Sequence, residues 1–297
     1  MKVLITGGGG FIGAWLARRL AGMGAAIRVF DLKDDRRLVR AVAGDAVADA
    51  LDWHVGDVAD AAAVRAAAQG CDRLIHLAAL LTPACQADPV RGATVNLIGT
   101  LNLFEAARAH GIGTVLYMSS AAVFGPDDGT TPRPTTHYGA FKLACEGSAR
   151  AYRADHGIAS AGFRAFVVYG PGRDLGLTAG PSLACRAAAE GRDYTIPYSG
   201  PADYVFVGDL VEAFAATAAR PPQGAAVYNV VGEQADAADV AAAIMRAAPG
   251  AAIRAEGPPL PVAADIAPGT LRDDYPEVPR TGLADGIART IGFYRAA

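Results

Sequence analysis

The sequence predicts an α/β fold, a doubly wound parallel sheet with a smaller, discontinuous C-terminal α/β domain. In the first half, short apolar runs alternate with alanine-rich amphipathic stretches. Apolar strands separated by helices are typical of a parallel sheet covered on both faces. A glycine-rich segment at residues 6–13 follows the first strand, and the alternation stops after Tyr169. A chain of 297 residues has room for about two domains.

Each element of the first half follows from the hydrophobic period. Buried strands are expected at residues 3–5, 27–30, 51–55, 73–77, 114–118 and 160–168. Stretches with helical periodicity lie between them, at residues 11–23, 61–69, 90–110 and 138–156. Because strands that alternate with helices form βαβ units, the crossovers between them should be right-handed.

The second half is less regular. Helices are expected at residues 182–190 and 209–219, and strands at residues 204–207 and 226–231. Residues 249–281 contain several prolines and little periodicity, and a short helix closes the chain. We therefore expect one domain from residues 1–170 plus 205–231, and a second domain from residues 171–204 plus 232–297.

Composition and charge exclude several classes of protein. The net charge of −3 gives no electrostatic footprint for nucleic acid or an anionic membrane. The four cysteines and five histidines show no spacing typical of a disulfide framework or a metal site, so no metal is expected. The N-terminus does not resemble a signal peptide, and no apolar window of about 18 residues exists. We expect a cytoplasmic protein with a small-molecule partner.

The loop at residues 6–13 has the features of a phosphate-binding turn. Gly7, Gly10 and Gly13 lie between a strand and a helix, where glycine allows a close approach to a pyrophosphate at the helix N-terminus. Asp31 ends the next strand, and a carboxylate there accepts ribose hydroxyls and repels a 2′-phosphate. The sequence therefore predicts NAD rather than NADP, although three cations nearby could attract a phosphate: Lys33, Arg36 and Arg37.

The spacing TGxxGxxG together with Tyr138-x-x-x-Lys142 resembles the extended short-chain dehydrogenase/reductase family, the NAD-dependent epimerase/dehydratase group. Further matching segments lie in the expected order at residues 56–58, 76–79, 95–96, 99–100, 119–125, 168–171 and 203–209. The resemblance covers nearly the whole chain. It implies a Rossmann-type NAD-binding domain, made of residues 1–170 plus 205–231, and a substrate-binding domain. It also implies a homodimer formed through the helices at 90–110 and 138–156.

The resemblance implies that Tyr138 is the general acid/base. A free tyrosine, with a pKa around 10, is a poor base at neutral pH. Lys142, one helical turn away, and a cationic nicotinamide ring would favour the phenolate. Only three of the 27 basic residues are lysines, so a lysine at this spacing is hard to attribute to chance. Ser120 matches the family residue that orients the substrate oxygen and stabilises developing charge.

The resemblance also implies two sets of contact residues. Beyond the glycines and Asp31, the cofactor set comprises Phe11, Ile12, Asp57, Val58, Leu77, Ala78, Ala79, Asn96, Tyr138, Lys142, Phe166 and Val168. The expected substrate contacts are Ser120, Ala121, Tyr138, Arg173 and Thr178. His76 is expected to be a packed residue at a strand end, and Arg164 a buried, paired arginine.

Several positions depart from the family pattern. Ala121 and Ala122 replace the Asp-Glu pair of sugar-nucleotide dehydratases, so that elimination lacks its acid and base. Three positions that serve the substrate of sugar-nucleotide epimerases, two of them cationic, carry uncharged residues here: Val167, Ala202 and Ala267. We therefore expect oxidation of a secondary alcohol in a small sugar acid, polyol or hydroxy acid. The alternatives are an NAD-retaining sugar or nucleotide-sugar epimerase and a non-catalytic NAD-sensing module.

Overall fold

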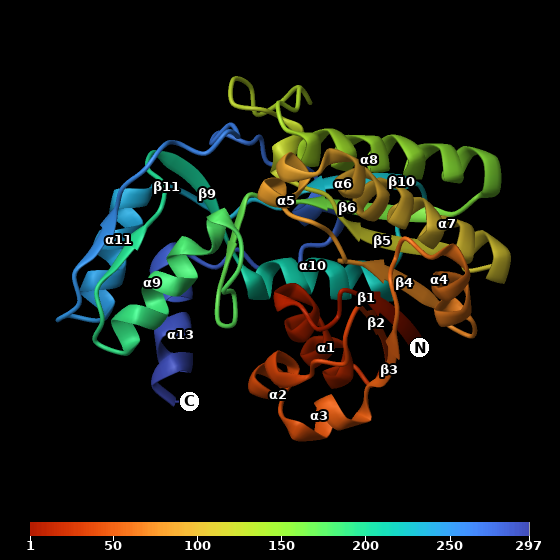
Figure 1. Cartoon of the computed structure of the whole chain (residues 1–297), viewed down its shortest axis with the longest axis horizontal. Coiled ribbons are helices and arrows are strands. Elements are labelled where there is room, and N and C mark those ends of the chain that lie inside the picture. The colour runs from red at the N-terminus through yellow and green to blue at the C-terminus, as the bar shows by residue number, and fades with distance from the viewer. Residues whose placement is uncertain (297) are drawn as a thin grey trace.

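The computed structural model, which describes residues 1–296, is built on a seven-stranded parallel sheet (Figure 1). Its strands lie in the order β10-β6-β5-β4-β1-β2-β3, and every neighbouring pair is parallel. Their bounds are β1 Lys2–Thr6, β2 Ala26–Asp31, β3 Asp52–Val55, β4 Arg73–His76, β5 Thr114–Met118, β6 Ala159–Arg164 and β10 Ala225–Asn229. This order confirms the Rossmann-type doubly wound sheet, in which the direction of winding reverses between β1 and β4.

Helices cover both faces of this sheet. Val3 and Ile5 of β1 belong to the core of one face and Leu4 to the core of the other, because successive strand residues point to opposite sides. The first face is covered by α1 (Phe11–Gly22), α2 (Arg37–Ala43), α3 (Asp45–Ala50) and α10 (Val207–Ala219). The second is covered by α4 (Ala61–Ala68), α7 (Gly99–His110) and α8 (His137–His156).

A smaller part of the molecule stands at the carboxyl ends of the central strands (Figure 1). It contains the sheet β11-β9-β7 and the pair β12-β8. The strands are β7 Val167–Tyr169, β8 Tyr194–Ile196, β9 Pro201–Phe206, β11 Glu233–Asp236 and β12 Ile253–Ala255. Its helices are α9 Gly180–Ala189, α11 Ala237–Ala247 and α13 Leu283–Ala296, and a short helix, α12 Leu271–Asp274, lies between β12 and α13.

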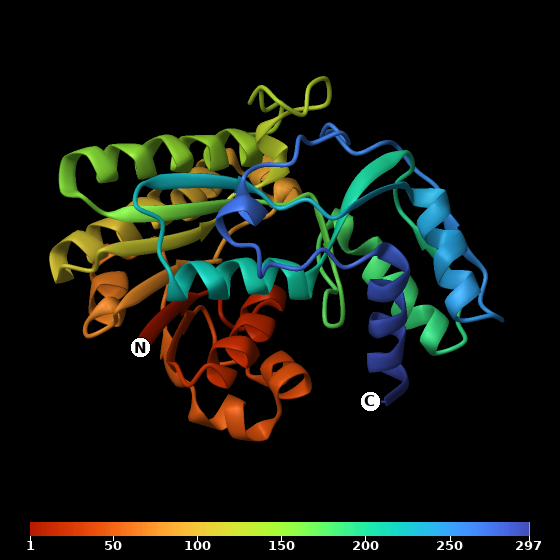
Figure 2. The same ribbon diagram turned by 180° about the vertical axis from the view of Figure 1, so that it is seen from behind.

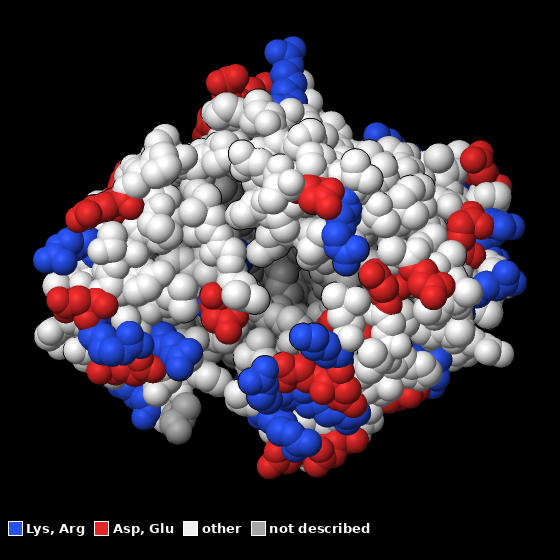
Figure 3. Space-filling model, in the orientation of Figure 1, with Lys and Arg blue, Asp and Glu red and all other residues white. Residues whose placement is uncertain are grey.

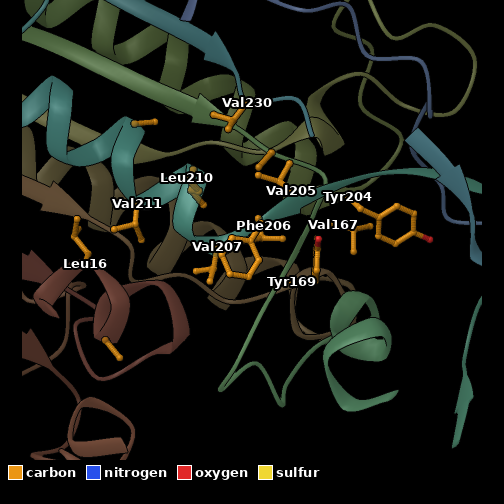
Figure 4. Packing of buried hydrophobic residues seen from close by; sticks show 14 of the residues in the cluster. Leu16, Val167, Tyr169, Tyr204, Val205, Phe206, Val207, Leu210, Val211 and Val230 are labelled. Carbon is orange, nitrogen blue, oxygen red and sulfur yellow. The ribbon is translucent and has the colours of Figure 1, made fainter. Parts of the chain in front are cut away.

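The two parts share one hydrophobic core. Figure 4 shows Phe206 of β9 near Leu210 and Val211 of α10, with Leu16 of α1 on the far side. Tyr169 of β7 packs edge-on against Phe206, with 5.8 Å between the ring centroids. Because this cluster is continuous, the small part is held firmly against the ends of the central strands.

Two predicted elements are interrupted. The expected strand at 160–168 is wrong as a single strand, because β6 ends at Arg164 and β7 joins the small sheet beside β9. Ala165, in the break between the two strands, accepts a hydrogen bond from the Ala121 N–H. The expected helix at 90–110 consists of α6 (Pro89–Ala93), a π-helical turn at Thr94–Ile98 and α7.

Several short elements were not predicted. Helices α2, α3 and α5 (Thr82–Ala87), helix α11, and strands β8, β11 and β12 have no counterpart among the expected elements. The proline-rich segment after β12 also takes a defined course. Figure 2 shows it (blue) crossing between the two parts of the molecule, and the Ala263 N–H donates to the Gly125 carbonyl.

Candidate active site

The glycine loop forms a cradle in which side chains have no room. Gly7 has φ +70°, and a Cβ there would lie 2.7 Å from the Ala78 amide nitrogen in the segment after β4. A Cβ on Gly13 would lie 2.6 Å from the carbonyl oxygens of Gly7 and Gly8. Gly10 precedes α1 and offers no side-chain cap, so the N–H groups of the first turn are available to an anion.

Asp31 at the end of β2 closes the far side of the cradle. One carboxylate oxygen accepts from the Gly9 N–H at 3.0 Å, and the other accepts from the Leu32 N–H at 2.7 Å. The arginines that follow have carboxylates of their own, since Arg36 pairs with Asp34 and Arg37 with Asp35. These ion pairs offset the charges of two of the three cations that could attract a 2′-phosphate, so the site fits NAD.

A cavity of about 460 Å³ extends from this cradle across the ends of β1, β2, β3 and β4. Eight residues of the predicted cofactor set line it: Gly7, Gly10, Asp31, Asp57, Val58, Leu77, Ala78 and Ala79. Five further members line the neighbouring cavity described below: Ile12, Tyr138, Lys142, Phe166 and Val168. Ligands of open α/β sheets bind at such a switch point, so the residues present suit an adenosine and its phosphates.

Asn96 does not line either cavity. Its side chain is fully buried, accepts from the Leu80 N–H at 2.7 Å and donates to the Leu80 carbonyl at 2.9 Å. The structure therefore places Asn96 behind the wall, where it fixes the segment after β4. Gly13 is also buried, and Phe11 lies outside both sets of lining residues.

Tyr138 and Lys142 lie on the first two turns of α8, where the sequence places them on one face. Thr136 caps this helix by accepting from the Gly139 N–H at 3.1 Å. Lys142 is only 2% exposed and donates to the Met118 carbonyl at 2.7 Å. Its ammonium nitrogen lies 5.7 Å from the centre of the Tyr138 ring. The chain thus holds a positive charge beside the phenol.

Ser120 follows β5 and faces the same space. Its hydroxyl accepts from the Ala122 N–H at 3.1 Å, which leaves its own hydrogen free to donate. Both Ser120 and Tyr138 line a cavity of about 220 Å³, together with Lys142. The neighbouring Ala121 is fully buried and does not line the cavity, whereas Ala122 does.

The walls of this second cavity are largely apolar. Figure 3 shows a hollow near the centre of the face whose visible walls are uncharged, with charged side chains around its rim. Lining residues that the sequence did not single out are Leu81, Thr82, Pro83, Met118, Thr136, Ala165, Gly176, Leu177, Leu260, Pro261 and Val262. Residues 81–83 follow β4, so the rule that ligands bind at carboxyl ends of strands could have found them. Nothing in the sequence around residues 260–262 marks them as lining residues.

Arg173 and Thr178 also line this cavity. The guanidinium donates to the Thr178 hydroxyl at 2.5 Å and to the Val168 carbonyl. It lies 5.9 Å from the Phe11 ring centre at the start of α1. The loop therefore brings both predicted substrate contacts to the cavity that holds Tyr138 and Ser120.

A buried ion pair lies beneath the active site. Arg164 forms two hydrogen bonds with Glu146, of 2.7 and 2.6 Å, and the Ser119 hydroxyl donates to the same carboxylate at 2.6 Å. Glu146 is one turn beyond Lys142 on α8, and Ser119 precedes Ser120. The pair therefore ties together the segments that carry all three predicted catalytic residues. Arg164 is paired as expected, but it is only partly buried, with 14% of its side chain exposed.

His76 is packed at the end of β4, as expected, and is 1% exposed. Its Nδ1 is 2.7 Å from the Thr6 hydroxyl, while its Nε2 has no partner within residues 1–296. Burial, reinforced by the charge of Lys142, lowers the pKa of His76 to about 3. The ring is therefore neutral at physiological pH.

The cradle, Asp31 and the Ser-Tyr-Lys set define an NAD-dependent enzyme of the extended short-chain dehydrogenase/reductase type. The model of the NAD dependent epimerase/dehydratase family matches residues 3–231, and the chain belongs to this family. A UDP-glucose 4-epimerase from Mycolicibacterium smegmatis is 32% identical over 99% of both chains.

Solved structures agree with this assignment. A Thermus thermophilus UDP-glucose 4-epimerase in complex with NAD has a TM-score of 0.86 at 28% identity, with both chains fully covered. A partial consensus L-threonine 3-dehydrogenase has a TM-score of 0.88 at 25% identity, again with full coverage of both chains. The cofactor of this chain is NAD. No helix within residues 1–296 is both long and apolar enough to cross a membrane.

Proposed function

We propose that the chain is an NAD-dependent epimerase that acts on a secondary alcohol of a sugar-type substrate. The observation that carries this proposal is the meeting of Ser120, Tyr138 and Lys142 at one cavity, next to the glycine cradle. The similarity to 4-epimerases over essentially the full chain supports epimerisation over oxidation with release of the ketone.

The chemistry follows from the positions of these side chains. NAD, when bound, takes up hydride from the substrate carbon and can return it. The Tyr138 phenolate would accept the hydroxyl proton of the substrate and give it back from the same oxygen. The Lys142 ammonium lies beside the Tyr138 ring, and the free hydrogen of Ser120 would hold the substrate oxygen in place.

Net oxidation of a small sugar acid, polyol or hydroxy acid is a second candidate, because the cavity provides little for a nucleotide diphosphate. Val167 and Ala202 are fully buried in the apolar core, so neither position offers a polar or charged group. The cavity of about 220 Å³ is below the range of about 300–1,000 Å³ that is usual for drug-sized ligands. The similarity to an L-threonine 3-dehydrogenase also supports a small substrate.

We propose that two parts of the chain have the separate binding roles that the sequence suggested. Residues 1–170 plus 205–231 would bind NAD, and residues 171–204 plus 232–297 would bind substrate. The predicted cofactor and substrate contacts that line the two cavities stand with it as proposals, with Ala122 in place of the buried Ala121 and with Asn96 acting through the Leu80 segment. A homodimer through α7 and α8 is proposed from the resemblance alone.

One experiment separates the two candidates. The purified enzyme with added NAD is incubated with UDP-glucose, free sugars, sugar acids, polyols and hydroxy acids, and both NADH absorbance and product stereochemistry by NMR are followed. Epimerisation predicts a new stereoisomer without accumulation of NADH. A ketone with stoichiometric NADH would establish the second candidate instead, and turnover of no substrate class would contradict both.

A further inference from the structure

The cavity beside Tyr138 contains a guanidinium group without a carboxylate partner. Within residues 1–296, no Asp or Glu oxygen lies within 4.0 Å of the Arg173 nitrogens, whereas many surface arginines have such a partner. Its two hydrogen bonds go to neutral oxygens, the Val168 carbonyl and the Thr178 hydroxyl. The positive charge is therefore not neutralised by the protein itself.

The loop that carries Arg173 is held in place from both sides. The Trp15 indole donates to the Pro171 carbonyl at 2.9 Å, and the Gly172 N–H donates to the Tyr294 hydroxyl at 2.8 Å. Gly172 has φ +89° and approaches Leu38, while Gly176 has φ +92° and approaches Leu81. The guanidinium is thus preorganised, and a ligand that used it would not have to order the loop.

An anion would relieve the energetic cost of this arrangement. Burial lowers the pKa of Arg173 to about 10, although Tyr198 and Tyr138 offset part of that effect. A cation removed from water and left without a counter-ion is unfavourable. The planar fork of arginine matches a carboxylate, and such charge-assisted bonds are among the strongest in proteins.

Much of the remaining cavity lining is apolar. It includes five residues with apolar side chains: Leu81, Leu177, Leu260, Pro261 and Val262. These side chains offer no hydrogen bonds, so hydroxyl groups placed against them would lose their water without compensation. A ligand of this cavity therefore has one polar end and one hydrocarbon end.

We propose that the substrate is a small hydroxy acid whose carboxylate binds Arg173 and Thr178 and whose aliphatic part contacts the apolar lining of the cavity. This proposal rests on the hydride-transfer site proposed above, takes a hydroxy acid in place of a sugar as the substrate, and holds whether an epimer or a ketone is released. It places the carbinol carbon between the carboxylate anchor and the pair Ser120 and Tyr138.

The same oxyanion chemistry could come from a second source. Arg173 lies over Phe11 at the start of α1, next to the turn that would hold the cofactor pyrophosphate. The protein already provides free N–H groups for that phosphate, and Arg173 lines the cavity of Tyr138 and not that of Asp31. The substrate is therefore the favoured source, and the two sources differ in what removal of the charge does to NAD affinity.

The test measures binding of 3-hydroxyhexanoate to the NAD-loaded enzyme by calorimetry, with hexane-1,3-diol as the neutral counterpart. The variants are Arg173→Met, Arg173→Lys and a matched control, Arg186→Met, whose residue pairs with Glu190 on α9. Affinity for the acid should exceed that for the diol and fall about 10- to 100-fold in Arg173→Met. Arg173→Lys should recover part of it. The diol, the control and NAD affinity should change less than about twofold.

Three outcomes would overturn the proposal. The first is equal binding of the acid and the diol to wild type, and the second is an equal weakening of both ligands by Arg173→Met. The third is a main effect of Arg173→Met on NAD affinity, which would assign the guanidinium to the pyrophosphate. Equal binding of acid and diol together with hydride transfer on another substrate would refute this inference alone. Loss of all hydride chemistry would refute the proposed function instead.

Discussion

At the scale of single residues, most side chains lie where the sequence places them. Lys142 is buried beside Tyr138, and Arg164 is paired with Glu146 though only partly buried, because both follow from spacing on a helix or position at a strand end. Asn96 and Ala121 differ. Asn96 is bound to Leu80 instead of lining a cavity. Ala122 lines the cavity where Ala121 was expected, because the turn at Ala121–Val123 has only three residues and determines which side chain faces the cavity.

His76 should make the stability of the fold depend on pH. Its folded pKa of about 3 lies below the unfolded value of about 6.5, so the folded state binds fewer protons. The stability it contributes is present above pH 6.5 and is lost as pH falls towards 3. Between pH 7.5 and 5 the loss is about 2 kcal/mol.

Urea unfolding of wild type and His76→Asn at both pH values measures this effect. The wild type should lose about 2 kcal/mol more than the variant on acidification. His54 is partly exposed, so His54→Asn serves as the matched control and should keep the wild-type pH dependence. The same loss in wild type and in His76→Asn would show that other groups are responsible.

At the scale of elements, the glycine cradle and α1 act as one unit. A Cβ on Gly13 would lie 2.6 Å from backbone atoms of Gly7 and Gly8, whereas Gly22 at the other end of α1 has open space around it. Gly13→Ala should therefore displace the loop, weaken NAD binding more than about tenfold and lower stability by about 1–3 kcal/mol.

Gly22→Ala is the internal control for this effect, since it adds the same methyl group to the same helix. Its NAD affinity should stay within about twofold of wild type, with stability unchanged or slightly raised. Calorimetric titration with NAD compares the three proteins. Unchanged affinity in Gly13→Ala would mean that the turn does not hold the cofactor.

At the scale of the whole molecule, sequence periodicity was enough for the large sheet. The run at 160–168 shows the limit of that reasoning, because its strand propensity is continuous while its hydrogen bonds go to two different sheets. The segment at 260–262 shows a second limit. It reaches the cavity through distant contacts such as Ala263 with Gly125, which leave no local pattern.

The substrate was the least predictable feature. Missing polar and cationic side chains at Val167 and Ala202 suggested a small molecule, and their burial supports that interpretation. The choice between epimerisation and oxidation depends on whether the ketone stays bound, which residue types alone do not determine. The similarity to sugar epimerases favours epimerisation over oxidation.

The central claim is that Tyr138 exchanges the substrate proton, and the most direct test compares wild type with Tyr138→Phe on a substrate found by the screen. Tyr152→Phe is the matched control, because Tyr152 is on the same helix but donates to Glu105. We predict that Tyr138→Phe lowers kcat by at least about 100-fold with NAD affinity within about twofold, and that Tyr152→Phe keeps wild-type turnover. Equal turnover in Tyr138→Phe and wild type would contradict the account.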